Sequence, residues 1–178
     1  IPYPIIDSAV LYFRDEAGGS VEIKNGDTMP FRARPVASNN LVYLLPVKPG
    51  STQTFYLRVT SNNSIVIPME ILSAREFARK SSTEQLIMGF YYGLVFIMVF
   101  YYLMLFISIK DISYLLYAAM TLSLILYLMS IHGHSFVYLW PDFPGWGDLA
   151  PVVFLGFSGL FLLLFVRRYF DLARYSLF

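Results

Sequence analysis

The sequence predicts a β-sandwich followed by three membrane-spanning helices, and three observations support this fold class. Residues 86–109 run for 24 positions without Asp, Glu, Lys, Arg or His, and two further apolar runs follow. Residues 1–73 instead alternate short β-prone runs with turn residues. The first 85 residues contain 17 of the 25 charged side chains, nine basic and eight acidic. The boundary near Thr83 therefore separates a water-exposed half from a lipid-exposed half.

Residues 1–73 are expected to form part of an antiparallel sandwich, because β-prone runs recur about every ten positions. The runs are residues 8–13, 21–24, 41–47, 54–60 and 64–72. Asn25-Gly26, after the second run, is the strongest short turn signal in the chain. Prolines cannot donate to a strand ladder, so Pro30, Pro35, Pro46 and Pro68 are expected at strand ends or edges.

Residues 74–85 are expected to be a linker with a short surface helix, and residues 86–109 the first membrane span. Ser81 and Glu84 have the spacing of a capping box at the start of that span. As a helix, residues 86–109 would reach about 36 Å at about 1.5 Å per residue, enough to cross a hydrocarbon core of about 30 Å. A soluble core helix would instead carry a polar stripe, which this segment lacks.

Within the first span, Gly89 and Gly93 form a small-xxx-small pair on a ridge that continues through Tyr101. Such a ridge lets another backbone approach closely. We favour packing against another helix of the same chain, and the alternative is a homodimer contact.

Lys110-Asp111 interrupts the apolar sequence, and residues 112–131 form the second span, with Asp111 as the predicted N-cap. So short a turn predicts a helical hairpin. A loop over residues 132–149 leads to the third span, residues 150–170, and then to a tail, residues 171–178. We expect Asp148 to cap the third span, with Pro151 in its first turn.

The 132–149 loop is rich in aromatic residues that suit the level of lipid headgroups. These residues are Trp140, Trp146, Tyr138 and Phe143. His132 and His134 suggest metal ligands, but nearby only Asp142 and Asp148 could complete a site, so we interpret them as interfacial histidines and predict no metal.

Charge counting in short connections favours an extracytoplasmic β-domain and an extracytoplasmic 132–149 loop. Lys110, Arg167, Arg168 and Arg174 lie on the opposite side, and the loop has no Lys or Arg. When Arg75, Arg79 and Lys80 of the linker are also counted, the basic residues number four on the cytoplasmic side and three on the extracytoplasmic side. The net charge of +1 offers no basic stripe for nucleic acid. Phosphate-binding and catalytic motifs are absent, so no enzyme activity and no cofactor are predicted for this chain.

The chain resembles bacterial seven-transmembrane receptors with diverse intracellular signalling modules. In the membrane half the resemblance is carried by MGFYYGLVFIMVFYYLMLF, SIKDISYLLYAAM and SIHGHSFVYLWPDFPGW, and the best matches are Asp111, Tyr114, Tyr117, Gly133, Trp140 and Pro141. Residues 1–73 are similar to the C-terminal part of the extracytoplasmic jelly-roll domain of these receptors. That match rests on KNGDTMPFRARPV, with Gly26, Asp27, Pro30, Phe31, Arg34 and Pro35, and on FYLRV, with Leu57 and Arg58.

The resemblance implies a periplasmic sensor of carbohydrate-like ligands, in the bacterial inner membrane, that signals to a cytoplasmic output domain such as a diguanylate cyclase or histidine kinase. We expect the sequence to be a piece of a longer protein, which would supply four more helices and that domain. Candidate ligand-binding residues are Arg34, Tyr56 and Arg58, taken as exposed. The alternatives are a membrane-anchored scaffold that binds a protein and half of a transporter, which is the weakest because the spans contain no ionisable side chain.

Overall fold

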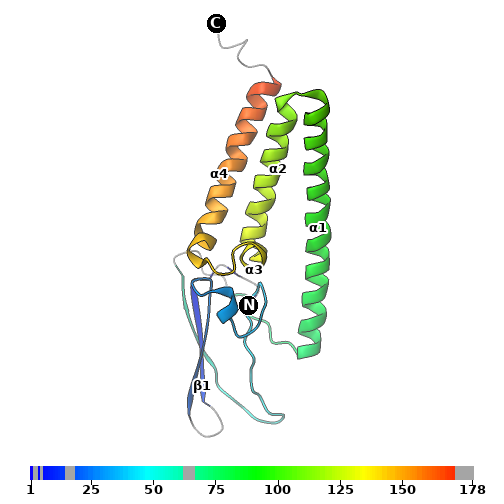
Figure 1. Cartoon of the computed structure of the whole chain (residues 1–178). Coiled ribbons are helices and arrows are strands. Elements are labelled where there is room, and N and C mark those ends of the chain that lie inside the picture. The colour runs from blue at the N-terminus through cyan, green and yellow to red at the C-terminus, as the bar shows by residue number, and fades with distance from the viewer. Residues whose placement is uncertain (2–3, 5, 15–18, 62–66, 171–178) are drawn as a thin grey trace. The chain divides into compact units, whose positions relative to one another are not determined.

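The computed structural model describes residues 1, 4, 6–14, 19–61 and 67–170. The chain divides into two compact units. The β unit consists of Ile1–Glu70 together with Met129–Ala150, and the helix unit consists of Ile71–Leu128 together with Pro151–Phe178 (Figure 1). The first part of the chain therefore forms one unit with a segment that lies between two of the helices in sequence.

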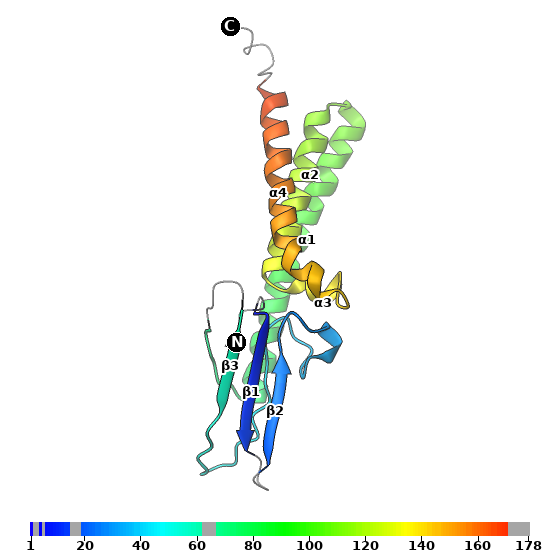
Figure 2. The same cartoon turned by 90° about the vertical axis from the view of Figure 1, so that its left-hand side faces the viewer.

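Three strands form one antiparallel sheet in the order β2–β1–β3 (Figure 2). The strands are β1 (Ser8–Arg14), β2 (Ser20–Asn25) and β3 (Tyr56–Thr60). In the middle of the sheet, Leu11 of β1 lies opposite Ile23 of β2 and Leu57 of β3. Because side chains alternate along a strand, these three share the face of the sheet that faces the core.

The core of the β unit lies against this face. Ile6, Ala9 and Leu41 are completely buried, and Leu57 and Val59 of β3 pack against them. Tyr43 closes the cluster, since its hydroxyl donates a 2.6 Å hydrogen bond to the Ala9 carbonyl. Burial of its ring raises the pKa of the Tyr43 hydroxyl to about 12.

The predicted fold class is confirmed, since an antiparallel β-sheet precedes helices that are apolar enough to cross a membrane. The described residues of the β part form one three-stranded sheet, so the division into strands differs from the prediction. The predicted strand 41–47 contributes buried side chains but has irregular backbone. Its first amide, that of Leu41, donates to the Ile1 carbonyl at 3.2 Å, so the segment bonds the chain start instead of joining a ladder. Residues 67–72 are also irregular, and the rest of that predicted run, 64–66, lies outside the described residues.

Helix α1 (Ala74–Ile109) begins earlier than the sequence predicts, and the expected linker is its first part. The capping box is formed by Ser73 and Glu76, where the Glu76 amide donates to Ser73 Oγ at 3.3 Å and the Ser73 amide donates to Glu76 Oε2 at 3.1 Å. The Ser81/Glu84 box is therefore wrong, because those residues lie inside a helix that is already formed.

A tight turn joins α1 to α2 (Ile112–Ile131), as predicted. Lys110 ends α1 in the left-handed region, with φ of 60°. Asp111 then caps α2, since its Oδ1 accepts a 2.9 Å hydrogen bond from the Ser113 amide. In the helix unit the ring of Tyr117 lies 4.2 Å from that of Tyr102 in α1.

The segment predicted as a loop after α2, residues 132–149, contains the unpredicted short helix α3 (His134–Tyr138) and the start of the last helix. We call this whole segment the connection. Helix α4 (Pro144–Tyr169) starts at Pro144, where the missing amide costs little. The prediction that Asp148 caps this helix and that Pro151 lies in its first turn is therefore wrong. Pro151 lies inside α4 and cannot donate to the Gly147 carbonyl one turn earlier.

Among the described residues, three helices are long and apolar enough to cross a membrane, namely α1, α2 and α4. The positions at which these helices enter the membrane stay predictions. A Cβ added at Gly89 or Gly93 would meet no described atom within 4 Å, and Tyr101 is 58% exposed. The described helices do not cover this ridge, so its packing role also stays a prediction.

Candidate functional site

The β unit contains a joint between the loops of the β-sheet and the 132–149 connection. The Phe31 amide donates to the Pro141 carbonyl at 2.9 Å, and Asn39 Nδ2 donates to the His132 carbonyl at 3.2 Å. The rings of Phe31 and Phe136 meet edge to face, with centroids 6.1 Å apart. Residues more than 90 positions apart in sequence are thus bonded directly. We call these five residues, together with Arg34, the joint.

Arg34 is the polar centre of the joint. Its side chain is 8% exposed, and its guanidinium lies 5.5 Å from the ring centre of Phe31 and 5.1 Å from that of Phe136. Its Nη1 donates to the Ser38 carbonyl at 3.1 Å, and its Nη2 donates to the Gly26 carbonyl at 3.2 Å. Burial lowers the pKa of this guanidinium. One side chain therefore connects two loops of the β-sheet to α3.

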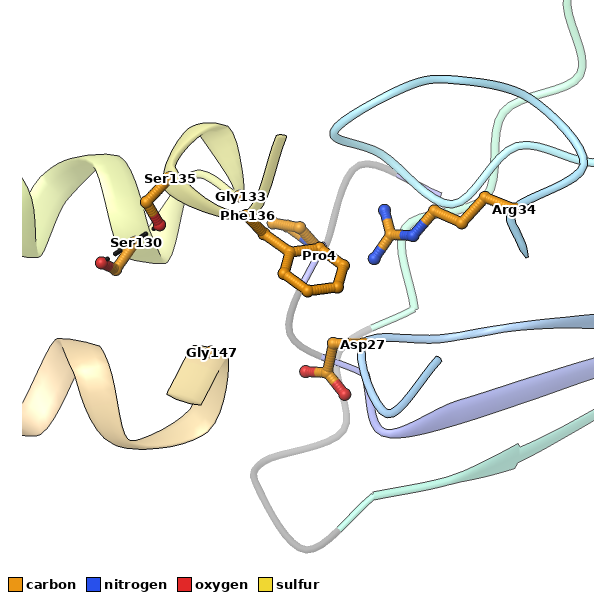
Figure 3. Close-up of a pocket in the computed structure, with 8 residues that line it drawn as sticks. All are labelled: Pro4, Asp27, Arg34, Ser130, Gly133, Ser135, Phe136 and Gly147. Carbon is orange, nitrogen blue, oxygen red and sulfur yellow. Dashed lines mark hydrogen bonds between the residues drawn. The ribbon is translucent and has the colours of Figure 1, made fainter. Parts of the chain in front are cut away.

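A cavity of about 20 Å³ adjoins the joint, which is room for about one water molecule. Its lining includes Asp27, Arg34, Phe136 and Gly147, and Figure 3 shows the Asp27 carboxylate turned toward it. Asp27 is 8% exposed. Burial, and then the carboxylates of Asp148 and Asp7, raise the pKa of Asp27 to about 7. The cavity is far too small for a sugar, so any such ligand must bind elsewhere.

The face of the sheet opposite the core offers such a surface. In the register, Tyr12 of β1 lies between Glu22 of β2 and Tyr56 of β3, and the next row has Val10 between Lys24 and Arg58. Tyr56 is 69% exposed, and Arg58 is also exposed. We call this set the tyrosine face, which consists of the half-buried Tyr12 and the exposed Glu22, Lys24, Tyr56 and Arg58. Two phenol rings flanked by charged groups can stack on a sugar ring and bond its hydroxyl groups.

Sequence reasoning placed the candidate ligand residues only in part. Tyr56 and Arg58 share the tyrosine face, and ligand binding there stays a prediction. Arg34 is buried in the joint, so the expectation that it is exposed is wrong, and ligand binding by its side chain stays a prediction. The histidine pair His132 and His134 has ring centroids 6.4 Å apart, and the interfacial interpretation stays a prediction.

Comparison with known families gives the decisive observation. Residues 84–178, more than half of the chain, match the family described as 7TM diverse intracellular signalling. The chain belongs to this family. Residues 1–73 match the accompanying domain, 7TMR-DISM extracellular 2. No curated protein and no solved structure matches. The 7TMR-DISM chain is thus a membrane protein with an extracellular domain followed by transmembrane helices.

Some of the residues that carried the resemblance to the 7TMR-DISM family lie at the joint and the cavity. They are Gly26, Asp27, Phe31, Arg34, Gly133 and Pro141. Sequence reasoning missed Asn39 and Phe136 because neither has a distinctive neighbourhood in the sequence. It also missed Asp7, whose carboxylate lies near that of Asp27. The short motifs that carried the resemblance were the sequence feature that indicated this site. Their residues come together in space when the chain folds.

Proposed function

We propose that this chain is the sensory part of a bacterial inner-membrane receptor, in which the tyrosine face binds a carbohydrate and the joint transmits the binding to the helices. The joint is the observation that carries this proposal. The connection that it binds, residues 132–149, leads directly from α2 into α4. A change in the β-sheet loops therefore reaches the ends of two membrane helices without crossing a flexible linker.

Transmission requires that the ligand favour one of two arrangements of the joint. The joint has the composition for such a switch. It contains one hydrogen bond from the Phe31 backbone amide and one from the Asn39 side-chain amide, and the guanidinium of Arg34 is shared among several acceptors. Each contact contributes about 1 kcal/mol, so a ligand of modest affinity can shift the balance.

The chain provides its own reporter for this test. Its two tryptophans, Trp140 and Trp146, both lie in the connection, with rings 6.2 Å apart. A panel of soluble mono- to hexasaccharides is titrated into the chain in lipid nanodiscs, and both heat and tryptophan emission are recorded. The proposal expects a binding sugar to change the emission, and Tyr56→Ala to abolish both signals.

Two outcomes would contradict the proposal. If no saccharide gives heat on titration, a carbohydrate is excluded as the ligand. Heat without a change in tryptophan emission separates binding from transmission and favours the scaffold alternative, in which the extracellular domain binds a partner and the helices only anchor it. Lys48→Ala, an exposed residue of the β unit outside the tyrosine face, serves as the control that should leave both signals close to those of the parent.

Sidedness is tested separately, because the chain has no cysteine and single cysteines can be placed at will. The assay uses spheroplasts, bacterial cells that have lost the outer membrane but keep a closed inner membrane. In these cells a membrane-impermeant maleimide should label Phe143→Cys in the connection. It should not label Lys110→Cys in the α1–α2 turn until the membrane is opened. Labelling of Lys110→Cys in closed cells would contradict an extracytoplasmic β unit.

A further inference from the structure

Three carboxylates converge beside the joint, within the β unit. They belong to Asp7, just before β1, to Asp27, just after β2, and to Asp148, in the second turn of α4. One carboxylate oxygen from each lies within 4.8 Å of the other two. Three negative charges so close together repel one another strongly unless a positive charge lies among them.

Two of the three carboxylates have ordinary explanations. Asp7 Oδ1 accepts a 3.3 Å hydrogen bond from the Ser61 hydroxyl. Asp148 is exposed to water and lies near the positive N-terminal end of α4. Each of these groups would be stable there by itself.

Asp27 has no such explanation. Its side chain is more than nine-tenths buried, and neither carboxylate oxygen has a hydrogen-bond partner among the described residues. A buried, unbonded carboxylate is costly. The structure nevertheless fixes it in place, because the Asp27 amide donates to the Ile6 carbonyl at 3.0 Å. The preceding Gly26 has φ of 153°, and a Cβ there would collide with the Asp7 carbonyl.

The space in front of Asp27 is suited to a small occupant. The cavity it lines has room for about one water-sized sphere, and Gly147, the neighbour of Asp148, lines the same cavity. Figure 3 shows the Asp27 carboxylate directed to the side where Gly147 lies. Arg34 lines the cavity as well, but its Nη atoms donate to backbone carbonyls.

We propose that Asp7, Asp27 and Asp148 bind a calcium ion. All three ligands are carboxylate oxygens, which hard divalent cations prefer. Calcium binds oxygen at about 2.3–2.6 Å, so two ligands of one ion can lie up to about 5 Å apart, which accommodates the observed spacing. Magnesium, at about 2.0–2.1 Å, limits the separation to about 4.2 Å and demands a stricter octahedron.

The titration of the cluster agrees with this geometry. Burial and the two neighbouring carboxylates raise the pKa of Asp27. The Arg34 guanidinium opposes this shift only in part, because the pKa of Asp27 stays raised. A divalent cation among the three groups would add counter-charge and keep all of them ionised.

A cation at this position joins the start of α4 to one end of the antiparallel β1–β2 pair, where β1 begins and β2 ends. It would stabilise the joint next to Phe136, which lines the same cavity as Asp27. The site is independent of the saccharide proposal, because it requires no ligand on the tyrosine face. It would make the stability of the β unit depend on extracellular calcium.

The test is calorimetry on the whole chain in nanodiscs of zwitterionic lipid, stripped with EDTA and titrated with CaCl₂ and, separately, MgCl₂. We expect one calcium per chain with a Kd of about 10⁻⁴–10⁻³ M, the range typical of extracellular modules, and weaker binding of magnesium. Asp148→Asn should weaken calcium binding about tenfold or more, since it removes one charged ligand. Because Asp148 is exposed, this variant should fold normally.

The matched control is Asp142→Asn in the same connection. Asp142 is exposed and forms a 3.5 Å ion pair with the exposed Arg32, so its replacement should leave the calcium Kd unchanged. Asp27→Asn should also lose calcium binding, yet in EDTA it should be at least as stable as the parent, because it removes a buried charge. No saturable heat with calcium, equal Kd values for Asp148→Asn and Asp142→Asn, or tighter binding of magnesium than of calcium would each overturn the proposal.

Discussion

Replacing Arg34 by methionine should destabilise the joint more than the replacement of any other described arginine of the β unit. Methionine keeps much of the aliphatic volume but removes the donors to the carbonyls of Gly26, Ser38 and Asn39, which lie 3.1–3.4 Å from the guanidinium nitrogens. A buried carbonyl left without a donor costs about 1–3 kcal/mol. The hydrogen bond to the Asn39 carbonyl is long. We therefore expect the loss of all three hydrogen bonds to lower the free energy of unfolding by about 3 kcal/mol.

For a unit of this size, about 1 kcal/mol corresponds to about 4–8 °C in Tm, so Arg34→Met should lower the Tm by about 12 °C or more. The assay is thermal unfolding followed by tryptophan emission, which reports the connection alone. The control is Arg58→Met on the tyrosine face, where an exposed replacement should change stability by less than about 0.5 kcal/mol. Equal Tm values for the two variants would refute the assignment of Arg34 to the joint.

Three further predictions concern backbone strain and pH. Gly133→Ala should destabilise the chain more than Gly50→Ala in chemical unfolding: both glycines have φ near 75°, but a Cβ at Gly133 would lie 2.7 Å from Pro4 Cβ and one at Gly50 meets nothing. Equal losses would contradict the close contact. Lys110→Gly should raise the stability of the α1–α2 hairpin by about 1 kcal/mol in detergent melts, because only glycine adopts φ of 60° without strain. Burial lowers the pKa of the His134 imidazole, so the parent should lose stability relative to His134→Gln as the pH falls below about 6.5. A stability difference that stays constant between pH 7.5 and 5 would exclude that effect.

The helical half could be predicted closely because its signals are local. The bounds of α2 match the prediction, since Asp111 caps the helix through a bond within its first turn. The start of α1 could not be chosen with the same certainty, because Ser73/Glu76 and Ser81/Glu84 have the same spacing and composition. The first pair forms the box, and the helix then continues without a break.

The β half and the joint depend on contacts that the sequence does not display. Residues 41–47 look like a strand, but their apolar side chains close the core while the amide of Leu41 bonds the chain start. Asn39 meets His132 across 93 positions, and no periodicity indicates that pairing. The acidic cluster is equally long-range, since Asp148 is distant in sequence from both Asp7 and Asp27.

The account depends most on direct contact between the extracellular domain and the α2–α4 connection. A double-mutant cycle between Phe31→Leu and Phe136→Leu, measured by unfolding of the whole chain in nanodiscs, tests that contact. The edge-to-face pair predicts a coupling free energy of about 0.5–1.5 kcal/mol. Strictly additive effects of the two replacements would show that the rings do not meet and would contradict the joint.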